Sequence, residues 1–493
     1  MTILMHEPTE ELFLGVIHPD AALFADYFNV DQASREHRNY RKALTEAGAR
    51  VLTVREVLLD GTLDGEGNAV EGPALDALRT FAGEFLVYNT DAIPAQRDAQ
   101  RAYKEEVLRK ANPKDLLRII LLQPEVVLSH TEGNTGFAAT YRQRPMMNLF
   151  YMRDQMIATF KGLVIARMHS PQREVESRVA EFCLNKIGMP PIGRISGEGA
   201  YLEGGDFLPF GSSAFIGCGL RTTQKAIDQL MENDWLGTDR LMVVRDNWLE
   251  QEQMHLDTYF NCIDRDLVTL SANRYKAGPD SSQYLTVDVY ERKNGRYSRT
   301  VEGACFVDFL EKTLGVKVIP ISRPDELNYA NNYLTIGPRR IMAVAGQSQE
   351  LQQALAAGQL KTYMVNFCDK AIRAVQSGSK KNRYKYVNDA KEYIETHYSD
   401  GNLSLNHVSD AIGISAPYLS GLFNEVIKEN FNSYLNSYRV KQAKQFLEET
   451  SQNIAEIGYK CGFNSAQSFS RVFKKYTGYT PGQYREWKKG QQP

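Results

Sequence analysis

Three short clusters of polar residues in the first half of the chain could do chemistry. In chain order they are Asn148 to Gln155 with Asp154 inside it, then Glu203, Gly204, Gly205 and Asp206, and then Met254, His255, Leu256, Asp257 and Thr258. Each cluster places a carboxylate at an expected strand end or tight turn, where side chains from separate elements converge on a pocket. Four carboxylates and one imidazole in such a pocket would suit a bound cation.

Two kinds of cation fit this set of residues. A guanidinium is planar and has five donors, which carboxylates match with bidentate hydrogen bonds. A divalent metal ion would use the same carboxylate oxygens as ligands. Residue types and spacing favour neither reading over the other, and polar decoration of surface turns is a third alternative.

The elements around these clusters alternate between short β-rich runs and amphipathic segments. The β-rich runs include LFLGVIH, ARVLTVREVL, GLVIARM, SAFIGCG, RLMVVRD and RRIMAVAG. This alternation predicts an α/β fold over residues 1–376, and no repeat period is apparent. The interval from Pro73 to about Leu128 is helix-rich and is expected to be a helical insertion. The polar, basic residues 377–385 are expected to form a linker to a C-terminal region that is almost entirely helical.

The C-terminal region carries one pattern twice. Residues 403–427 (LSLNHVSDAIGISAPYLSGLFNEVI) and residues 453–481 each predict a short helix, a turn with glycine and a second helix. In the second copy, Gly462 is expected to end the first helix, and Asn464 or Ser465 to cap the next. This is the helix-turn-helix pattern, although one copy alone would favour an ordinary helical hairpin.

The second helix of each copy presents side chains suited to base edges and phosphates. The candidates for DNA contact are Ser415, Tyr418, Ser420, Asn424, Ser465, Gln467, Ser468, Arg471, Lys474 and Lys475. Between the copies, Phe431 to Glu449 has helical period and would span about 28 Å. Successive major grooves on one face of DNA lie ~34 Å apart, so one chain could read two adjacent grooves.

Charge and cysteine usage agree with this division. From Ser379 onward there are 16 Lys and Arg against 11 Asp and Glu, whereas the whole chain has a net charge of −2. A basic C-terminal region on an acidic body fits a part that meets phosphate.

The six cysteines are scattered without metal-ligand spacing, no apolar stretch could span a membrane, and the N-terminus lacks signal-peptide features. We therefore expect a cytoplasmic protein without a membrane partner.

The segment from Tyr386 to Trp487 resembles the AraC/XylS family of transcriptional regulators. The matching motifs are S-x-x-Y-L-S-x-L-F, Y-x-x-x-R, I-x-E-I, C-G-F, F-S-R-V-F-K-K and G-x-T-P-x-x-Y-R. The resemblance implies an all-α double helix-turn-helix domain at residues 386–490, whose partner is double-stranded DNA. Three residues depart from the family pattern: Asn430 stands where Gly is usual, Gly458 where Ala is usual, and Phe469 where Tyr is frequent.

The segment from Leu12 to Gln359 resembles arginine deiminase, within the guanidino-group-modifying superfamily. The match runs through FNVDQASREHRNYRKALTEAGARVL, NLFYMRDQ, Gln-Arg-Glu at residues 172–174, LEGGDFLPFG, IGCGLRTT and MHLDTYFNCIDRD, and the insertion from Pro73 is also where that family has one. The resemblance implies a five-bladed α/β propeller that binds a guanidino compound such as arginine. It also implies that no metal and no other cofactor is used.

The resemblance also implies roles for the clustered residues. In the ligand-binding set, Asp154 and Asp257 would grip the guanidinium, Glu203 and His255 would lie beside its carbon, Asn148 and Arg221 would hold the amino-acid end, and Asp206 would share the pocket. We expect mutual repulsion of the carboxylates to make the empty pocket electrostatically unfavourable.

The family's reaction also needs a cysteine that attacks the guanidinium carbon. In the family this cysteine follows a Gly-Gly-X-His segment, but the corresponding LKTYMVNFCDKAIRAVQSGSKKN has neither Gly-Gly nor His. No cysteine lies at residues 378–381, where the nucleophile is expected. Cys368 stands too early and is expected to be a small buried hydrophobe. Pro171 occupies a position where the family often has a carboxylate-binding Arg.

The sequence therefore predicts a sequence-specific transcription regulator whose arginine-deiminase-like domain senses arginine or a related guanidino compound without turnover. The first alternative is a bifunctional regulator that converts arginine to citrulline and ammonia through Cys368. The second is a regulator whose α/β domain is only a dimerisation scaffold. A homodimer is compatible with each of these.

Overall fold

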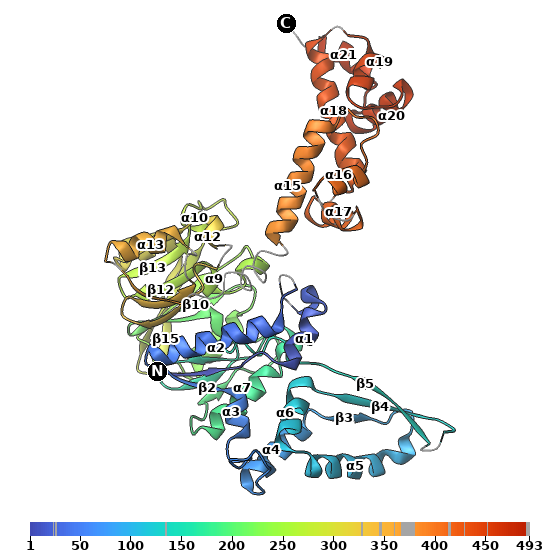
Figure 1. The fold of residues 1–493 in the computed structure, drawn as a ribbon. Helices are drawn as coiled ribbons and strands as arrows, with labels where there is room; N and C mark the ends of the chain where they lie inside the picture. The colour runs from blue at the N-terminus through green and yellow to red at the C-terminus, as the bar shows by residue number, and fades with distance from the viewer. Residues whose placement is uncertain are drawn as a thin grey trace. The chain divides into compact units, whose positions relative to one another are not determined.

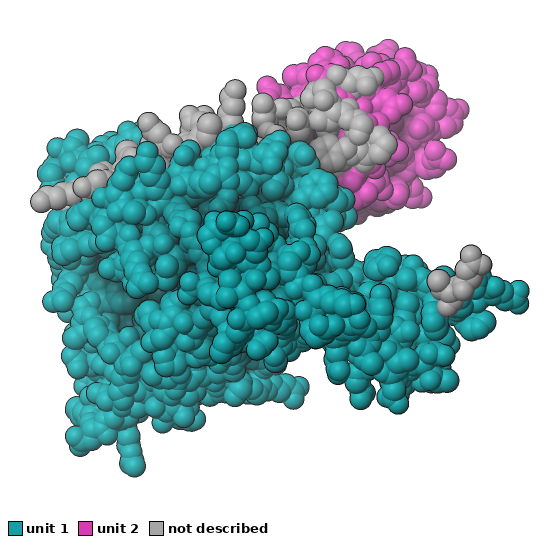
Figure 2. Space-filling model, turned by 60° about the horizontal axis from the view of Figure 1, so that its bottom comes forward, with its two compact units in different colours: residues 1–376 teal, residues 377–493 magenta. Residues whose placement is uncertain are grey.

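The structure is a computed structural model with two compact units, Met1–Gln376 (unit 1) and Ser377–Pro493 (unit 2) (Figures 1 and 2). It describes residues 1–22, 24, 27–133, 136–326, 329–344, 348–358, 360–365, 380–412, 416–427, 429–450 and 452–489. In this described part, no helix is both long enough and apolar enough to cross a membrane.

Unit 1 is an α/β structure built on a repeated unit of an antiparallel strand pair, a helix and a third strand parallel to the second. Three sheets follow this pattern: β6 (Met156–Ala158), β7 (Leu163–Ile165) and β8 (Gly193–Arg194); β12 (Phe260–Asp264), β13 (Leu267–Ser271) and β16 (Lys317–Ile321); and β17 (Leu334–Gly337), β18 (Arg340–Val344) and β19 (Lys361–Val365). A fourth, of β9 (Phe207–Phe210), β10 (Ser213–Cys218) and β11 (Arg240–Arg245), is widened by the hairpin β14 (Thr286–Lys293) and β15 (Arg296–Cys305). In a fifth, β1 (Thr2–Met5) pairs in parallel with β2 (Arg50–Thr53).

Helices connect and cover these sheets. The longer ones are α2 (Val30–Glu46), α7 (Glu176–Lys186), α8 (Gln224–Glu232) and α13 (Gln349–Ala356), and the shorter ones are α1 (Glu10–Val16), α3 (Val54–Leu59), α9 (Leu256–Tyr259), α10 (Ala272–Tyr275), α11 (Phe306–Asp308) and α12 (Arg323–Glu326). The sequence analysis detected no repeat period, because the strands of this repeat are short and the hairpin β14–β15 interrupts the spacing between its copies.

The insertion from Pro73 is not purely helical. It contains α4 (Pro73–Gly83), α5 (Arg97–Lys110) and α6 (Pro113–Leu122), but also a sheet of β3 (Val87–Asn89), β4 (Glu125–His130) and β5 (Phe137–Arg142). It therefore reaches beyond the expected end at Leu128, because the run EVVLSH continues as a strand that pairs with FAATYR. In Figures 1 and 2 the insertion stands out from the rest of unit 1 as a lobe.

One large apolar core joins the insertion to the body of unit 1. Helices α4 and α6 bury amphipathic faces in it, and α6 begins with the cap Asn112 followed by Pro113. Leu149 and Met152 belong to the same core, with relative exposures of 0% and 6%. This packing fixes the chain just before Asp154, the carboxylate of the first predicted cluster.

Unit 2 is entirely helical in its described residues. Its helices are α15 (Lys380–His397), α16 (Leu405–Ile412), α17 (Ala416–Leu422) with a continuing π-helical turn (Phe423–Ile427), α18 (Phe431–Glu449), α19 (Ile454–Lys460), α20 (Ala466–Thr477) and α21 (Pro481–Lys489). The expected long helix from Phe431 to Glu449 is confirmed as α18. Helix α15 begins at Lys380, inside the expected linker 377–385, because Lys and Arg favour helix and this segment leads into the buried positions Val387 and Ala390.

Helix α18 packs against two separate apolar cores, one for each helix-turn-helix copy. Its first half contributes Phe431 and Leu435 to the first core, and its second half contributes Val440 and Ala443 to the second. Arg439 lies between them and donates from Nε to the Tyr398 carbonyl at 2.9 Å and from Nη2 to the Asp400 carbonyl at 2.7 Å. The two copies are thus held on one helix.

The three departures from the AraC/XylS pattern have local explanations. Asn430 caps α18, because its side chain accepts a hydrogen bond from the Ser433 amide at 2.8 Å. A Cβ on Gly458 would lie 2.8 Å from Cδ1 of Phe469, so this glycine makes room for the aromatic ring.

Gly462 follows α19 with φ +81°, as expected for the residue that ends that helix.

Candidate functional site

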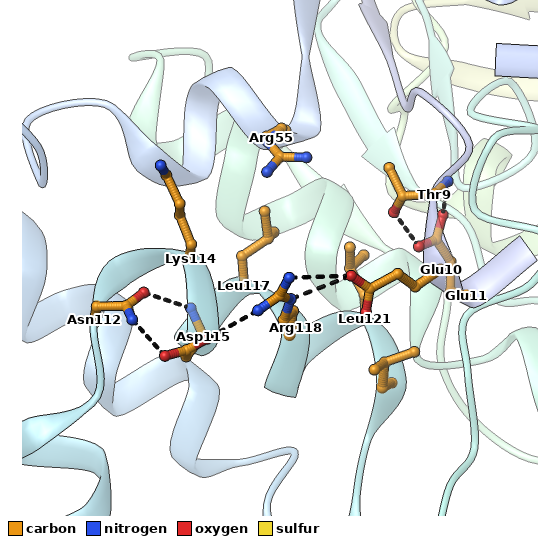
Figure 3. Close-up of a pocket in the computed structure, with 11 residues that line it drawn as sticks. Thr9, Glu10, Glu11, Arg55, Asn112, Lys114, Asp115, Leu117, Arg118 and Leu121 are labelled. Atoms are coloured by element: carbon orange, nitrogen blue, oxygen red, sulfur yellow. Dashed lines mark hydrogen bonds and ion pairs between the residues drawn. The ribbon is translucent and has the colours of Figure 1, made fainter. Parts of the chain in front are cut away.

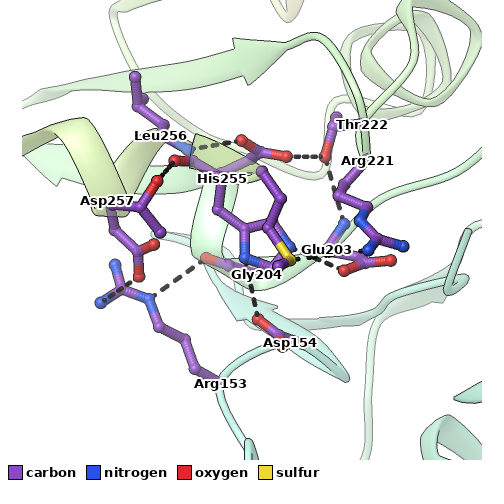
Figure 4. A network of polar contacts seen from close by, with 12 residues as sticks. Arg153, Asp154, Glu203, Gly204, Arg221, Thr222, His255, Leu256 and Asp257 are labelled. Carbon is purple, nitrogen blue, oxygen red and sulfur yellow. Dashed lines mark hydrogen bonds and ion pairs between the residues drawn. The ribbon is translucent and has the colours of Figure 1, made fainter. Parts of the chain in front are cut away.

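The structure brings the three predicted clusters together in unit 1 (Figure 4). Asp154 lies in the loop before β6, Glu203 lies just before β9, and His255 directly precedes α9. All three are buried, and one ligand atom from each lies within 4.8 Å of the others. Elements distant in sequence therefore converge on one buried acidic cluster.

The pair Gly204 and Gly205 is needed for this close approach. A Cβ on Gly204 would lie 1.9 Å from the carbonyl oxygen of Arg153, and a Cβ on Gly205 would lie 2.8 Å from the ring of His255. Neither position has room for a side chain. The Glu-Gly-Gly-Asp sequence thus lets the backbone pass directly beside the first and third clusters.

Glu203 and His255 form a buried ion pair. The imidazole Nε2 lies 2.7 Å from Oε2 of Glu203, whose Oε1 accepts the backbone amide of His169 at 3.0 Å. Burial alone would lower the pKa of His255, but the carboxylates of Asp154, Glu203 and Asp206 outweigh it and raise the pKa to about 10. Burial alone would raise the pKa of Glu203, but the hydrogen bond and charge of His255 bring it to about 2. The imidazole is therefore a cation at neutral pH.

Arg173, which belongs to the match at residues 172–174 but received no site role in the sequence analysis, places a guanidinium inside this cluster. Its Nη1 lies 3.0 Å from Asp154 and 3.9 Å from Glu203, and its Nη2 lies 3.0 Å from Glu176. Burial would lower the pKa of Arg173, but these three carboxylates raise it instead. The available sequence signals were the family match at residues 172–174 and the spacing to Glu176, which puts the two side chains one helical turn apart. Pro171 opens the short 3₁₀ turn that positions Arg173.

Asp206 lies in the cluster, but both of its carboxylate oxygens are already engaged. Oδ2 accepts the hydroxyl of Thr222 at 2.6 Å, and Oδ1 accepts the amide of Leu256 at 2.8 Å. Burial raises its pKa to about 6. These bonds tie the second cluster to the start of α9, so Asp206 positions the pocket, although the sequence analysis placed it in the ligand-binding set.

Three predicted ligand-binding residues keep a buried polar atom without a hydrogen-bond partner among the described residues. These atoms are Oδ1 of Asp257, Oδ1 of Asn148 and Nε of Arg221. The other oxygen of Asp257 lies 3.2 Å from Arg153, and Nη2 of Arg221 donates to Gln251 at 3.3 Å. Burying a polar atom without a partner costs free energy. Such atoms are therefore candidates for contact with a ligand.

Asp154, Glu203 and His255 lie close enough together to hold a metal ion. Arg173 already supplies positive charge at Asp154, since its Nη1 lies 3.0 Å from that carboxylate. The cluster therefore already accepts hydrogen bonds from one guanidinium of the chain itself.

The expected nucleophile region, including Cys368, lies outside the described residues. Among the described cysteines, burial raises the pKa of Cys183 to about 12 and also raises those of Cys218 and Cys262. A raised pKa disfavours the thiolate that nucleophilic attack requires.

The second helix-turn-helix copy presents its predicted donors on α20. Gln467, Arg471, Lys474 and Lys475 are exposed, which leaves them free to meet DNA. Ser465 caps the helix by accepting the Ser468 amide at 3.1 Å, as one of the two expected caps. In the first copy, Tyr418 and Ser420 lie in α17, Asn424 follows as an exposed residue, and Ser415 lies outside the described residues.

A second hollow lies between the starts of α1 and α6 and the helix α3 (Figure 3). It is a groove of about 170 Å³ whose lining includes Glu10, Arg55, Lys114, Asp115 and Arg118. Arg118 pairs within the lining with Glu10 and Asp115, each at 3.2 Å. Most of the polar side chains that line it are exposed, and several of them pair with one another, so we assign this groove no ligand.

Comparison with known families defines both units. Residues 20–360 match the family model described as Arginine deiminase, and residues 408–486 match that described as Helix-turn-helix domain. The first match covers more than half of the chain, and the chain belongs to the arginine deiminase family. Its second unit is a helix-turn-helix domain of the AraC type joined to that arginine deiminase domain.

Individual relatives show the same two parts. An arginine deiminase of Halobacterium salinarum is 25% identical over 423 residues, which cover 69% of this chain and 83% of the relative. An uncharacterized HTH-type transcriptional regulator of Staphylococcus aureus is 36% identical over 127 residues, which cover 26% of this chain and 16% of the relative.

Solved structures also match each part. DDAH from Pseudomonas aeruginosa, as a mutant complexed with citrulline, has 14% identity and a TM-score of 0.41, and the match covers 75% of this chain and 94% of that one. The C-terminal domain of AraT from Geobacillus stearothermophilus has 32% identity and a TM-score of 0.21, covering 21% of this chain and 84% of that one.

Proposed function

We propose that this protein is a DNA-binding transcription regulator whose arginine deiminase domain binds arginine or a related guanidino compound without turning it over. The observation that carries the proposal is the contact between the Arg173 guanidinium and Asp154 at 3.0 Å. A site that holds a guanidinium of its own chain has the negative charge and the acceptor geometry that a guanidino ligand requires.

The buried polar atoms that lack a hydrogen-bond partner indicate how the ligand would be oriented. The free oxygen of Asp257 would accept from the ligand's guanidinium, while Arg221 and Asn148 would bind the carboxylate and amino groups at the other end. In the ligand-bound state the guanidinium would share or displace the contact that Arg173 makes with Asp154. Different affinities of two domain states for the ligand are sufficient to change DNA binding.

The absence of turnover is proposed from the cysteines. The sequence has no cysteine at residues 378–381, and the raised pKa values of Cys183, Cys218 and Cys262 disfavour their thiolates. The alternative is a bifunctional regulator that uses Cys368. Release of citrulline from arginine, abolished in Cys368→Ser, would identify that alternative.

The proposed setting for the pocket is a five-bladed propeller. Five of the six sheets described in unit 1, all but that of the insertion, support it, and four of these five have the same strand–strand–helix–strand order. Glu203 and His255 directly precede elements of this repeat, so the blades would bring them to a common centre. Because its proposed partner is the chromosome, we place the protein in the cytoplasm.

A thermal-shift panel tests this function. Arginine should raise the melting temperature of the full chain by mass action, and citrulline, which lacks the positive charge, should do much less. Asp257→Asn should reduce the arginine effect, whereas Asp98→Asn, on the exposed surface of α5, should not. Arg221→Ala should reduce the preference for arginine over agmatine. Equal shifts from arginine and citrulline would contradict a guanidinium site.

A further inference from the structure

The two carboxylates that would grip a guanidino ligand each contact an arginine of the chain itself. Asp154 lies 3.0 Å from Nη1 of Arg173, and Oδ2 of Asp257 lies 3.2 Å from Nη1 of Arg153. In Figure 4 the guanidinium of Arg153 is turned toward the carboxylate of Asp257. A ligand that binds both carboxylates must therefore share or replace these two contacts.

Arg173 is held too firmly to be replaced. Its side chain is 6% exposed and lies within 3.9 Å of three carboxylates, those of Asp154, Glu176 and Glu203. Its Nε also donates to Glu176 at 3.1 Å. Moving this guanidinium out would leave buried carboxylates without a partner, which is strongly unfavourable. We therefore expect Arg173 to stay in place when a ligand binds.

Arg153 is held much more weakly. Its side chain is 37% exposed, and among the described residues Asp257 is the one carboxylate that it contacts. Its Nε makes a long hydrogen bond of 3.4 Å to the carbonyl oxygen of Gly204. Because this guanidinium is already partly solvated, turning it into water costs little free energy.

Asp257 is only half satisfied by this contact. Its Oδ1 is buried and has no hydrogen-bond partner among the described residues, whereas Oδ2 faces Arg153. Burial raises the pKa of Asp257, and the charge of Arg153 opposes that rise. A guanidinium binds a carboxylate best through two parallel hydrogen bonds, one to each oxygen. A ligand that replaced Arg153 could make both.

We propose that Arg153 is the side chain that a guanidino ligand displaces: it occupies Asp257 in the ligand-free protein and turns toward solvent when the ligand binds, while Arg173 stays on Asp154. This inference rests on the proposed function and names the competitor within the same site. One guanidinium replaces another, so the buried carboxylate of Asp257 keeps a positive partner in both states.

The exchange has a consequence for sensing. The apparent affinity for the ligand is reduced by the fraction of molecules in which Asp257 is open to it. Arg153 therefore sets the concentration of free arginine at which the domain responds, and weakening its contact should make the sensor respond at lower concentration.

Titration of arginine into the full chain, followed by calorimetry, tests this role. Arg153→Met keeps the aliphatic stem but removes the charge, and should raise the affinity about fivefold, the size of one partly exposed ion pair. Arg153→Lys keeps a cation that can reach Asp257 and should stay closer to the wild type. The matched control is Arg194→Met, whose arginine is 39% exposed and pairs with Glu181, and this variant should bind as the wild type does.

A double-mutant cycle distinguishes displacement from a general effect of charge. In an Asp257→Asn background, Arg153→Met should give no gain in affinity, because asparagine has no charge to hold Arg153. The same gain in that background would overturn the proposal, as would equal or weaker binding by Arg153→Met than by the wild type. Those results would leave the proposed function standing, whereas no binding by the wild type or by any variant would contradict the guanidinium site itself.

Discussion

The guanidinium of Arg173 lies 3.0 Å from the carboxylate of Asp154, inside the pocket that the sequence predicted for a guanidino ligand. With protonated His255 it supplies two positive charges to the carboxylates of Asp154, Glu203 and Glu176. The expectation that the empty pocket is destabilised by repulsion between its carboxylates is therefore wrong. A ligand would gain less from charge neutralisation than the sequence suggested, and more from satisfying Asp257, Asn148 and Arg221.

Replacing Arg173 tests whether the stability of unit 1 depends on this buried guanidinium. Arg173→Ala leaves buried carboxylates unpaired and should destabilise unit 1 by about 3–5 kcal/mol, measured by chemical denaturation. Low millimolar methylguanidine should restore part of this stability, since it can fill the vacated position. Arg178→Ala removes a half-exposed arginine paired with Glu84 and should change stability by no more than about 1 kcal/mol. An Arg173→Ala variant that is as stable as the wild type, and whose stability does not change with methylguanidine, would contradict the role given to Arg173.

The pKa of His255 predicts a pH dependence in the alkaline range. Its folded-state pKa of about 10 is above its ordinary value of 6.5, so its stabilising contribution is complete below pH 6.5 and is lost as the pH rises through 10. The melting temperature of unit 1 should fall over this range more steeply in the wild type than in His255→Gln. Parallel curves for the two proteins would show that His255 is not charged in the folded state.

The close packing of Gly458 and Phe469 predicts the effect of restoring the usual alanine. Gly458→Ala would bring a methyl group to 2.8 Å from the ring of Phe469 and should cost about 1–3 kcal/mol through overpacking. Gly421→Ala, in α17 with open space around the glycine, should instead be neutral or stabilising by up to about 1 kcal/mol. Thermal unfolding of unit 2 measures both, and a stabilising Gly458→Ala would show that the ring can move at no cost.

The exposed face of α20 predicts how DNA binding depends on salt. Lys474→Ala with Lys475→Ala should weaken binding and reduce the slope of log affinity against log salt by ~0.9 for each phosphate that the two lysines no longer neutralise. Arg471→Ala should also weaken binding. Lys488→Ala removes a lysine on α21 that lies 3.4 Å from Glu448 and should leave the slope unchanged. An unchanged slope in the double variant would remove α20 from the DNA interface.

Much of the architecture could be predicted because local patterns determine it. The bounds of α18 follow from its helical period and from the cap Asn430, and Gly462 ends α19 because its left-handed backbone suits glycine. The convergence of Asp154, Glu203 and His255 was expected from their places at strand ends and turns. The choice of a guanidinium over a metal came from the family resemblance, since residue types and spacing left the two equally open.

Other features depend on packing that no local pattern encodes. The place of Arg173 in the pocket is set by the turn from Pro171 and by the position of Glu203, which is 30 residues further along the chain. The sheet in the insertion forms because β4 pairs antiparallel with β5, although both strands lie near residues that strongly favour helix. The engagement of both oxygens of Asp206 likewise depends on Thr222 and Leu256, which come from two other segments.

Titration calorimetry of arginine into the full chain tests the central claim most directly, because binding and turnover give different heats. The account predicts a saturable isotherm that returns to baseline after each injection, and that is weakened by Asp257→Asn. A sustained heat after each injection, together with citrulline in the sample, would show an active deiminase. No heat of binding, or equal binding in Asp257→Asn, would show that the pocket is not a guanidinium sensor.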